Sequence, residues 1–322
     1  MSPAVSRVVA GTVAGAAVAG LGALAYGGLV ERNRFTVRYE QVPVLDPGAR
    51  SITILHLSDL HMAPWQRIKQ EWVRSLAALE PDLVINTGDN LGHERGLEGL
   101  QEALDSFRGV PGVFVHGSND YFGPTAKNPL KYLSSPSGGG RREPDLDTGA
   151  LERYFTDELG WLDLNNTARA IEYRGSRIEL FGVNDAHRGW DRLDRLTGAI
   201  DEMRENVGWQ DDPSGPEAVT IGVTHSPYQR VLNTFITHGA DVIFAGHTHG
   251  GQVRLPGQPA IVTNCDIPRD QAQGLSVWHH ASRAAYLNVS AGLGTSIYAP
   301  VRFSCPPEAV VVTLTPGDIG YS

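Results

Sequence analysis

Short apolar runs bounded by polar residues recur along most of the chain. Five of them end in a cluster that contains Asp, His or Asn, and they span residues 52–57, 83–86, 113–115, 221–223 and 242–245. Such runs are typical of buried strands. Between the early runs, the apolar positions of 72–79 and 97–107 repeat with the spacing of amphipathic helices. Strands that alternate with helices predict an α/β fold with a largely parallel sheet.

The remaining segments complete this pattern. Residues 35–42 alternate between apolar and polar side chains and predict an edge strand that stops at Pro43. Residues 134–140 form a Gly/Ser-rich stretch that predicts a loop, followed by a helix near 151–159. The polar segment 201–217 predicts a surface helix and loop. No internal repeat or strong domain boundary interrupts the chain after the first strand.

The first 34 residues have a different character. No charged residue occurs from 8 to 30, and this run is rich in Ala, Val, Gly and Leu. About 20 apolar residues suffice for a transmembrane helix, whereas a helix of a soluble domain would show a polar face. We therefore predict an N-terminal membrane anchor over 1–34 and one domain over 35–322. A cleaved signal peptide stays open as the alternative, because residues 23–25 read Ala-Leu-Ala.

The charges that flank the apolar run bear on the side of the membrane. Arg7 precedes the run, and Arg32, Arg34 and Arg38 follow it. The excess of positive charge after the run would keep the C-terminal domain in the cytoplasm. The expected location is therefore the cell membrane. The flanking charges favour a cytoplasmic domain, and the opposite orientation stays open.

Composition narrows the classes of partner and cofactor. The net charge is −9, from 27 basic and 36 acidic residues, which disfavours a nucleic-acid partner. An acidic chain that handles phosphate needs another source of positive charge, and bound metal cations supply it. The two cysteines, Cys265 and Cys305, are too few for a disulfide framework or a cysteine zinc site.

The polar clusters supply a mixed set of metal-binding side chains. They are Asp59, His61, Asp89, His225, His247 and His249. Because ligands gather at the carboxyl ends of parallel strands, we expect these side chains to lie close together. Carboxylates mixed with imidazoles suit two divalent ions of Mn, Fe, Zn or Co better than calcium. Two such ions, about 3.5–4 Å apart, can activate a shared water for in-line displacement, with Asp89 the preferred bridge between them.

In their order along the chain, these clusters resemble the motifs of the calcineurin-like metallophosphoesterase superfamily. The motifs read Asp59-Leu60-His61, Gly88-Asp89, Gly117-Ser118-Asn119-Asp120, His225 and Gly246-His247-Thr248-His249. The resemblance covers roughly residues 50–315. The runs at 246–252 and 292–296 are similar to those of a bacterial branch that often carries an N-terminal membrane segment.

The resemblance implies a fold and a ligand set. The fold would be two packed β-sheets flanked by helices, preceded here by the predicted transmembrane helix. One metal would be held by Asp59, His61, Asp89 and His249, and the other by Asp89, Asn119, His225 and His247.

The third motif departs from the pattern of the family. Ser118 stands where the family has its ligand Asn, and Asn119 stands where it has a His that assists the leaving group. Asn119 is favoured as the ligand because an amide oxygen binds metals better than a neutral hydroxyl; Ser118 with a water is the alternative. Asp120 and His116 are candidates for the missing acid, and Asp185 and His187, just after an apolar run over 178–183, are further candidates for lining the cleft.

Together these features predict an enzyme that hydrolyses a phosphate ester with a hydroxide that bridges two metals. A phosphodiester is favoured, and a phosphomonoesterase stays open. A metal-binding scaffold with weakened catalysis is the other alternative, because the third motif is altered. The complete set of six Asp and His ligands argues against the scaffold. The N-terminal segment indicates a lipid-linked or envelope-derived substrate.

Overall fold

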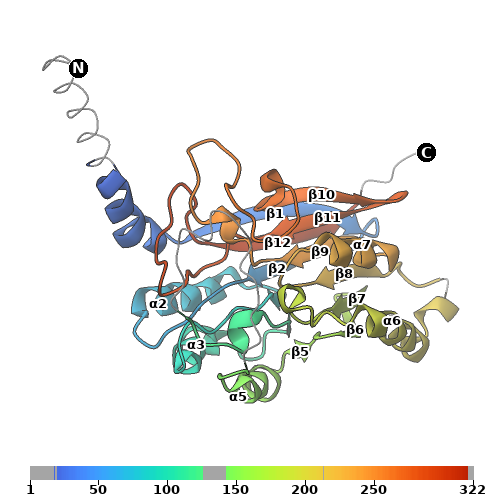
Figure 1. The fold of residues 1–322 in the computed structure, drawn as a ribbon. Coiled ribbons are helices and arrows are strands. Elements are labelled where there is room, and N and C mark those ends of the chain that lie inside the picture. The colour runs from blue at the N-terminus through green and yellow to red at the C-terminus, as the bar shows by residue number, and fades with distance from the viewer. Residues whose placement is uncertain (1–17, 19, 126–142, 213, 318–322) are drawn as a thin grey trace, which may run out of the picture.

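The computed structural model describes residues 18, 20–125, 143–212 and 214–317. The strands in these ranges form two six-stranded sheets (Figure 1). The first has the order β1-β12-β2-β3-β4-β5, with β1 (Thr36–Leu45), β12 (Glu308–Pro316), β2 (Ile52–Leu57), β3 (Leu83–Asn86), β4 (Gly112–Phe114) and β5 (Leu162–Asp163). The second has the order β10-β11-β9-β8-β7-β6, with β10 (Gly274–His280), β11 (Arg283–Val289), β9 (Val242–Ala245), β8 (Val219–Val223), β7 (Ser176–Gly182) and β6 (Thr167–Tyr173).

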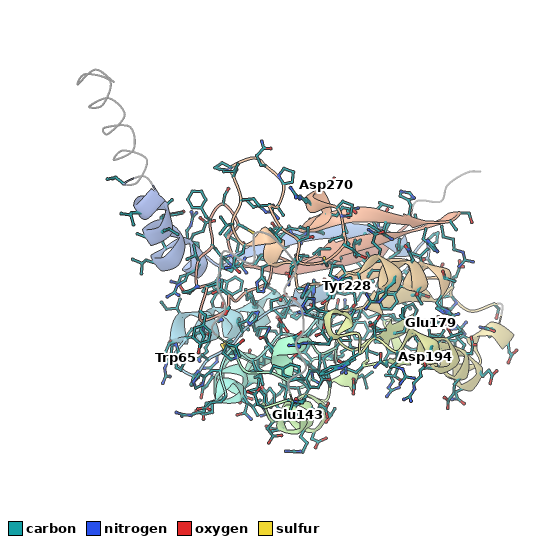
Figure 2. All side chains as sticks on the ribbon, in the orientation of Figure 1. Trp65, Glu143, Glu179, Asp194, Tyr228 and Asp270 are labelled. Carbon is teal, nitrogen blue, oxygen red and sulfur yellow. The ribbon has the colours of Figure 1, made fainter. Side chains whose placement is uncertain are left out.

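Helices cover the outer face of each sheet. On the first sheet lie α2 (Arg67–Ser75), α3 (Gly96–Leu104) and α5 (Thr148–Arg153), whose apolar side chains share one core with those of β2, β3 and β4. On the second lie α6 (Leu193–Val207) and α7 (Gln229–Thr237), which share another core with β7, β9 and β11. Side chains fill the space between these layers, and charged ones such as Glu143 and Asp194 lie at the edges of the molecule (Figure 2).

A third core lies between the two sheets. It joins Ile54 and Ile85 of the first sheet to Ile221 and Phe244 of the second, all fully buried. Because successive residues of a strand point to opposite faces, Leu55 packs instead in the core beneath the helices. The chain therefore adopts the sandwich of two sheets flanked by helices that was predicted, and each central strand is buried on both faces.

The first strand lies at a sheet edge, as predicted, but it does not stop at Pro43. β1 continues to Leu45 and pairs with β12 in parallel, with a register shift between Pro43 and Leu45. A proline has no backbone N–H to donate to a neighbouring strand, and an edge strand with a local irregularity accommodates it.

Two predicted helices begin earlier than the apolar spacing indicated. The helix predicted over 72–79 begins at Arg67 and is followed by a 3₁₀ turn over Leu76–Leu79. The helix predicted near 151–159 begins at Thr148. In both, the first turn has few apolar side chains that face the core, so the hydrophobic pattern begins after the helix does.

The N-terminal region is described only in part. Residues 20–29 form a helix that projects from the body of the molecule (Figure 1). Most of the predicted anchor, residues 1–17 and 19, lies outside the described residues, as does the loop predicted over 134–140. In the described part of the chain, no helix has both the length and the hydropathy needed to cross a membrane.

Candidate metal centre

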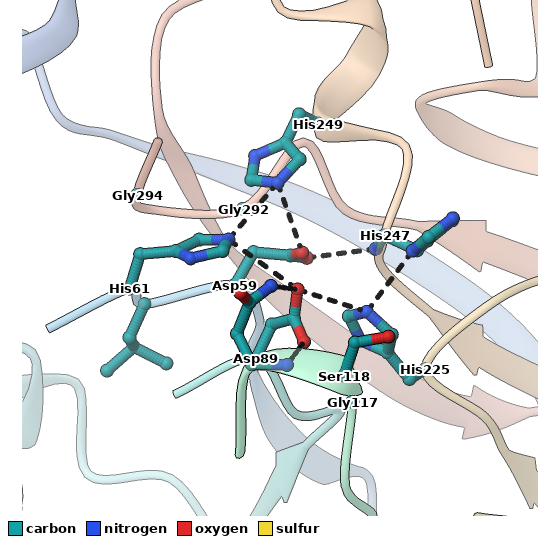
Figure 3. A network of polar contacts seen from close by, with 12 residues as sticks. Asp59, His61, Asp89, Gly117, Ser118, His225, His247, His249, Gly292 and Gly294 are labelled. Atoms are coloured by element: carbon teal, nitrogen blue, oxygen red, sulfur yellow. Dashed lines mark hydrogen bonds and ion pairs between the residues drawn. The ribbon is translucent and has the colours of Figure 1, made fainter. Parts of the chain in front are cut away.

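The six predicted Asp and His ligands lie together where the two sheets meet (Figure 3). Asp59 and His61 follow β2, Asp89 follows β3, His225 follows β8, and His247 and His249 follow β9. All six lie just beyond the carboxyl ends of four central strands. The sandwich therefore brings four chain segments, two from each sheet, to one point, as the alternating pattern predicted.

The backbone around this point is unusual. Five of the six residues have a positive φ: Asp59 (49°), His61 (40°), Asp89 (55°), His247 (68°) and His249 (48°). This region costs a non-glycine residue roughly 1–3 kcal/mol and persists only where the surroundings enforce it. Hydrogen bonds enforce it here, because the N–H of Asp59 donates to the Gly88 carbonyl at 2.9 Å and that of His61 to the Asp89 carbonyl at 3.0 Å. Such strain is typical of functional sites.

The side chains of Asp59, His61 and His249 surround one candidate position for a cation. The two Nε2 atoms of His61 and His249 are 3.3 Å apart, and Asp59 Oδ1 is 3.4 Å from His249 Nε2. Ligand atoms that surround a tetrahedral metal at 2.0–2.1 Å are separated by about 3.3–3.4 Å. Asp59 Oδ1 is also buried and accepts no hydrogen bond from any described residue. A cation would satisfy this oxygen, so the donor set fits a metal ion.

A second group of ligand atoms lies on the other side of Asp89. His225 Nε2 is 3.4 Å from Asp89 Oδ2 and 3.3 Å from His247 Nδ1. The same Asp89 oxygen is 3.6 Å from His61 Nε2. Asp89 Oδ2 therefore lies between the two groups, in the place that a bridging carboxylate requires.

Hydrogen bonds and burial prepare the imidazoles to act as ligands. His225 Nδ1 is 2.8 Å from the Thr87 carbonyl and donates to it, which leaves Nε2 free to offer its lone pair. Burial lowers the pKa of His61 to about 4 and that of His249 to about 3, and it holds the pKa of His247 well below its usual range. These three rings are thus neutral at pH 7, the state that binds metals.

His225 differs because of its acidic neighbours. Burial opposes its charged form, but the carboxylates of Asp89, Asp59 and Asp185 together raise the pKa of His225 well above its usual value. Burial raises the pKa of Asp59, whereas His225 more than offsets burial at Asp89 and lowers the pKa of that carboxyl. A metal would therefore compete with a proton at His225.

Two buried basic side chains support the cluster, and the sequence motifs did not reveal them. Arg302 is fully buried, and its Nη2 donates to the carbonyls of Ala291 (2.7 Å), Gly292 (3.0 Å) and Gly294 (2.8 Å). Lys69 Nζ donates to the carbonyl oxygens of Leu60 (2.5 Å) and His61 (3.2 Å). Both bind backbone oxygens of the segments that shape the site, which is a role that no local motif signals.

Asn119 and Ser118, the two candidate ligands of the third motif, make different contacts. The Asn119 amide lies at the cluster, with Nδ2 2.6 Å and its backbone N–H 2.8 Å from the two oxygens of Asp89. The Ser118 hydroxyl instead donates to Asp185. Rotation of the Asn119 amide would present its oxygen to a cation, so the geometry favours Asn119 over Ser118.

Asp120 lies behind the cluster and not within it. Its buried carboxylate accepts the backbone N–H groups of Asp89 (2.9 Å), Asn90 (2.7 Å) and Gly117 (2.9 Å). These bonds join the second and third motifs. A carboxylate that accepts three backbone N–H groups fixes the positions of the two loops. None of its contacts with the described residues supports the predicted role as an acid.

His116, the other candidate acid, is buried beside Asp120 and Glu152. Its Nε2 is 3.3 Å from Glu152 Oε1, and its Nδ1 is 3.6 Å from Asp120 Oδ2. Burial opposes the charged ring, but the two carboxylates prevail and raise the pKa of His116 to about 9. The ring is therefore an imidazolium within a structural ion cluster at pH 7.

This cluster predicts a pH dependence of stability. Because the folded pKa of His116 exceeds its ordinary value of 6.5, the stabilisation is complete below pH 6.5 and is lost as pH rises through about 9. We expect metal-free protein to lose on the order of 3 kcal/mol of unfolding free energy across that window. Chemical denaturation at several pH values measures this loss. The variant Glu152→Gln should show a shallower decline, and an identical decline would contradict the assignment.

Asp185 and His187, the two candidates for lining the cleft, lie beside the proposed ligands. Asp185, directly after the short run that ends at Val183, is buried and accepts the Ser118 hydroxyl. The His187 ring lies 4.7 Å from the His247 ring, and its backbone N–H donates to Asp185 at 2.9 Å. Their position beyond the end of β7, beside the other strand ends, is the signal that identified them.

Comparisons with known proteins agree with this geometry. Residues 52–251 match the family described as calcineurin-like phosphoesterase. The chain is 28% identical over 279 residues to YpbG of Bacillus subtilis, which covers 83% of this chain and 82% of that protein. It is 24% identical over 283 residues to the UDP-2,3-diacylglucosamine pyrophosphatase LpxG of Chlamydia trachomatis, a match that covers 80% of this chain and 82% of that protein. It is 26% identical over 227 residues to a Bos taurus transmembrane protein with metallophosphoesterase domain, a match that covers 66% of this chain and 44% of that protein.

Proposed function

The chain belongs to the calcineurin-like phosphoesterase family, and from that premise we propose that it hydrolyses a phosphodiester with two divalent metal ions. The observation that carries the proposal is the position of Asp89 Oδ2, within 3.4 Å of His225 Nε2 and 3.6 Å of His61 Nε2. A carboxylate oxygen between two imidazole groups is the arrangement that a dinuclear hydrolase needs.

The two groups of atoms support the ligand assignment that the family resemblance implies. Asp59, His61, Asp89 and His249 would hold one ion, and Asp89, Asn119, His225 and His247 would hold the other. Ions of Mn, Fe, Zn or Co at these positions supply Lewis acidity and an activated water. The buried Asp59 Oδ1, which accepts no hydrogen bond from the described residues, supports the first position.

The residues of the chain supply orientation and exclude water. The Thr87 carbonyl fixes the tautomer of His225, so its Nε2 points at Asp89. Asp120 holds the loop of Asp89 against the loop of Gly117 through three backbone N–H groups. Full burial of Asp59 and His225 keeps the ligand atoms in a low-dielectric environment, where charge stabilisation is strongest.

The absent histidine of the third motif bears on the substrate. General acid assistance is typically worth roughly 10²–10⁴-fold, and Asn119 cannot supply it. A leaving group that is itself a phosphate is stable as an anion and needs little protonation. We therefore favour a diphosphate-linked phosphodiester, a bond of the class named for the pyrophosphatase LpxG.

The N-terminal segment bears on the cellular location of the protein. We assign residues 1–34 to a membrane anchor and 35–322 to the phosphoesterase domain, at the cell membrane with the domain on the cytoplasmic side. The uncharged run over residues 8–30 supports this, as does the transmembrane character named for the Bos taurus relative. A lipid-linked or envelope-derived phosphate ester is the corresponding substrate, and a lipid-linked diphosphate is the kind of substrate for which LpxG is named.

A metal-binding scaffold on the same fold is the second candidate, and the altered third motif is the observation that favours it. Hydrolysis of bis(p-nitrophenyl) phosphate in the presence of Mn²⁺ separates the two candidates. Metal-dependent turnover supports the enzyme. Bound metal by elemental analysis, without turnover on this or any nucleoside diphosphate ester, supports the scaffold.

The third motif can be tested separately through two adjacent substitutions. Asn119→Ala should weaken binding of the second metal by roughly 10–100-fold, because it removes a side chain that lies at Asp89. Ser118→Ala should leave metal affinity near that of the parent chain, because its hydroxyl contacts Asp185. Calorimetric titration with Mn²⁺ measures both. A larger loss in Ser118→Ala than in Asn119→Ala would reverse the assignment.

A further inference from the structure

Three segments form a connected and largely apolar surface next to the candidate metal centre. They are the N-terminal helix with its following turn (20–34), the loop 252–264 and the loop 295–303, and we call them the apical surface. The blue helix and the orange loop rise on the same side of the molecule (Figure 1). Large apolar side chains on it range from 37% exposed at Ile261 to 72% at Leu29, and they also include Leu21, Leu24, Val253, Leu255 and Tyr298.

Direct contacts join these segments into one unit. The Arg302 backbone N–H donates to the Gly27 carbonyl at 3.2 Å, and the Arg254 N–H donates to the Phe303 carbonyl at 2.9 Å. The rings of Tyr26 and Phe303 meet edge to face, with centroids 6.3 Å apart. A groove of about 310 Å³ runs between helix and loops, lined by Tyr26, Glu31, Arg34, Thr36, Pro256, Phe303, Ser304 and Pro306.

The charge of the apical surface is opposite to that of the whole chain. The protein carries a net charge of −9, but the charged residues of these three segments are Glu31, Arg32, Arg34, Arg254 and Arg302. Glu31 and Arg302 are buried, so the charges that reach solvent are all positive. Exposed apolar side chains among arginines are the combination that binds the headgroup region of an anionic bilayer.

The loop 252–264 also connects this surface to the metal centre. Its tip carries the exposed Leu255, and its other end carries the buried Asn264. The Asn264 carbonyl lies 3.2 Å from Nε2 of His247, one of the proposed ligands. When the tip lies among lipid headgroups, the centre is therefore within one short loop of the bilayer surface.

We propose that the loops 252–264 and 295–303 of the apical surface insert into the headgroup region of an anionic bilayer, as a membrane contact additional to the N-terminal anchor to which the helix of this surface belongs. The inference rests on the proposed function for its consequence, which is that the substrate is a lipid-borne phosphate ester taken directly from the leaflet. A bilayer is the occupant that matches the local positive charge and the apolar run of residues 8–30 that leads into this surface.

Spin labels on the full-length chain test the insertion. The chain is reconstituted in vesicles of three parts phosphatidylcholine to one part phosphatidylglycerol, in a Cys265→Ser background; Cys305 is 1% exposed and stays unlabelled. Leu255→Cys reports on the loop tip and Leu24→Cys on the helix. Val277→Cys, 42% exposed on β10, is the matched control away from the apical surface. Accessibility to oxygen and to a water-soluble nickel chelate is measured for each label.

We expect the label at position 255 to be accessible to oxygen and shielded from nickel, while the label at 277 stays open to nickel. Equal nickel access at 255 and 277 would overturn the inference. Shielding of 255 from both reagents would also overturn it, because it indicates a second protein copy on this surface.

The outcomes separate this inference from the proposed function. A label at 24 in lipid with a label at 255 in water rejects the loop contact and leaves the anchor in place. Hydrolysis of bis(p-nitrophenyl) phosphate by the same vesicles tests the chemistry independently of where the loop lies. In vesicles of phosphatidylcholine alone, the lipid exposure of 255 should fall, and unchanged exposure would contradict the role of the arginines.

Discussion

Asp89→Asn is expected to lower metal-dependent hydrolysis of bis(p-nitrophenyl) phosphate by roughly 10²–10⁴-fold. The change keeps the shape of the side chain but removes the charge between the two ligand groups, a loss of about 3–5 kcal/mol for a buried charge with partners. It also places an NH₂ group against Asn119, whose Nδ2 and backbone N–H both point at this carboxylate at 2.6 and 2.8 Å. Two donors would then face each other.

The matched control is Asp194→Asn. Asp194 lies in the first turn of α6, where its carboxylate pairs with Arg192 at 2.6 Å on the surface (Figure 2). The same chemical change there should leave turnover and bound metal at the level of the parent chain. Full activity in Asp89→Asn, with metal content unchanged, would remove Asp89 from the centre of the site.

Gly294→Ala is expected to destabilise the fold and the metal centre together. A Cβ on Gly294 would lie 2.5 Å from the Leu60 carbonyl oxygen, 2.7 Å from that of Asp59 and 2.7 Å from His61 Cβ. These contacts are with the segment that carries two proposed ligands, so the segment must shift. We expect a loss of about 1–3 kcal/mol of unfolding free energy and roughly 10–100-fold weaker Mn²⁺ binding. Urea denaturation and calorimetric titration measure the two effects.

Gly198→Ala provides the contrast for this prediction. Gly198 lies within α6, and a Cβ there meets no atom within 4 Å. Alanine should therefore stabilise the chain slightly, by about 0.4–1 kcal/mol, and leave metal affinity unchanged. If both glycine variants lost stability equally and kept their metal affinity, close packing of Gly294 on the ligand segment would have no functional role.

The central strands were predictable because the residues of each strand carry the whole signal for it. The runs that became β2, β3 and β9 match their observed bounds, since each is apolar on both faces and stops at a polar cluster. The place of β12 in the sheet was not predictable in the same way. β12 lies between β1 and β2, and its pairing with β1 joins residues more than 250 positions apart, so no local signal specifies it.

The candidate site likewise contains residues that a local pattern reveals and residues that only the fold brings together. The six Asp and His residues were found because each motif is a short pattern at a strand end. Arg302 and Lys69 escaped notice because they bind backbone carbonyls, and only the fold brings those carbonyls to them. The Asp120 carboxylate accepts backbone N–H groups, and sequence proximity to Asn119 does not reveal these contacts.

The most direct test is a crystal structure of the chain grown with Mn²⁺, with anomalous diffraction used to locate the metal. The proposed function requires two anomalous peaks that both contact Asp89. One should lie against His61 and His249, and the other against His225 and His247. A single peak away from Asp89, or none at saturating Mn²⁺, would contradict a dinuclear phosphoesterase centre.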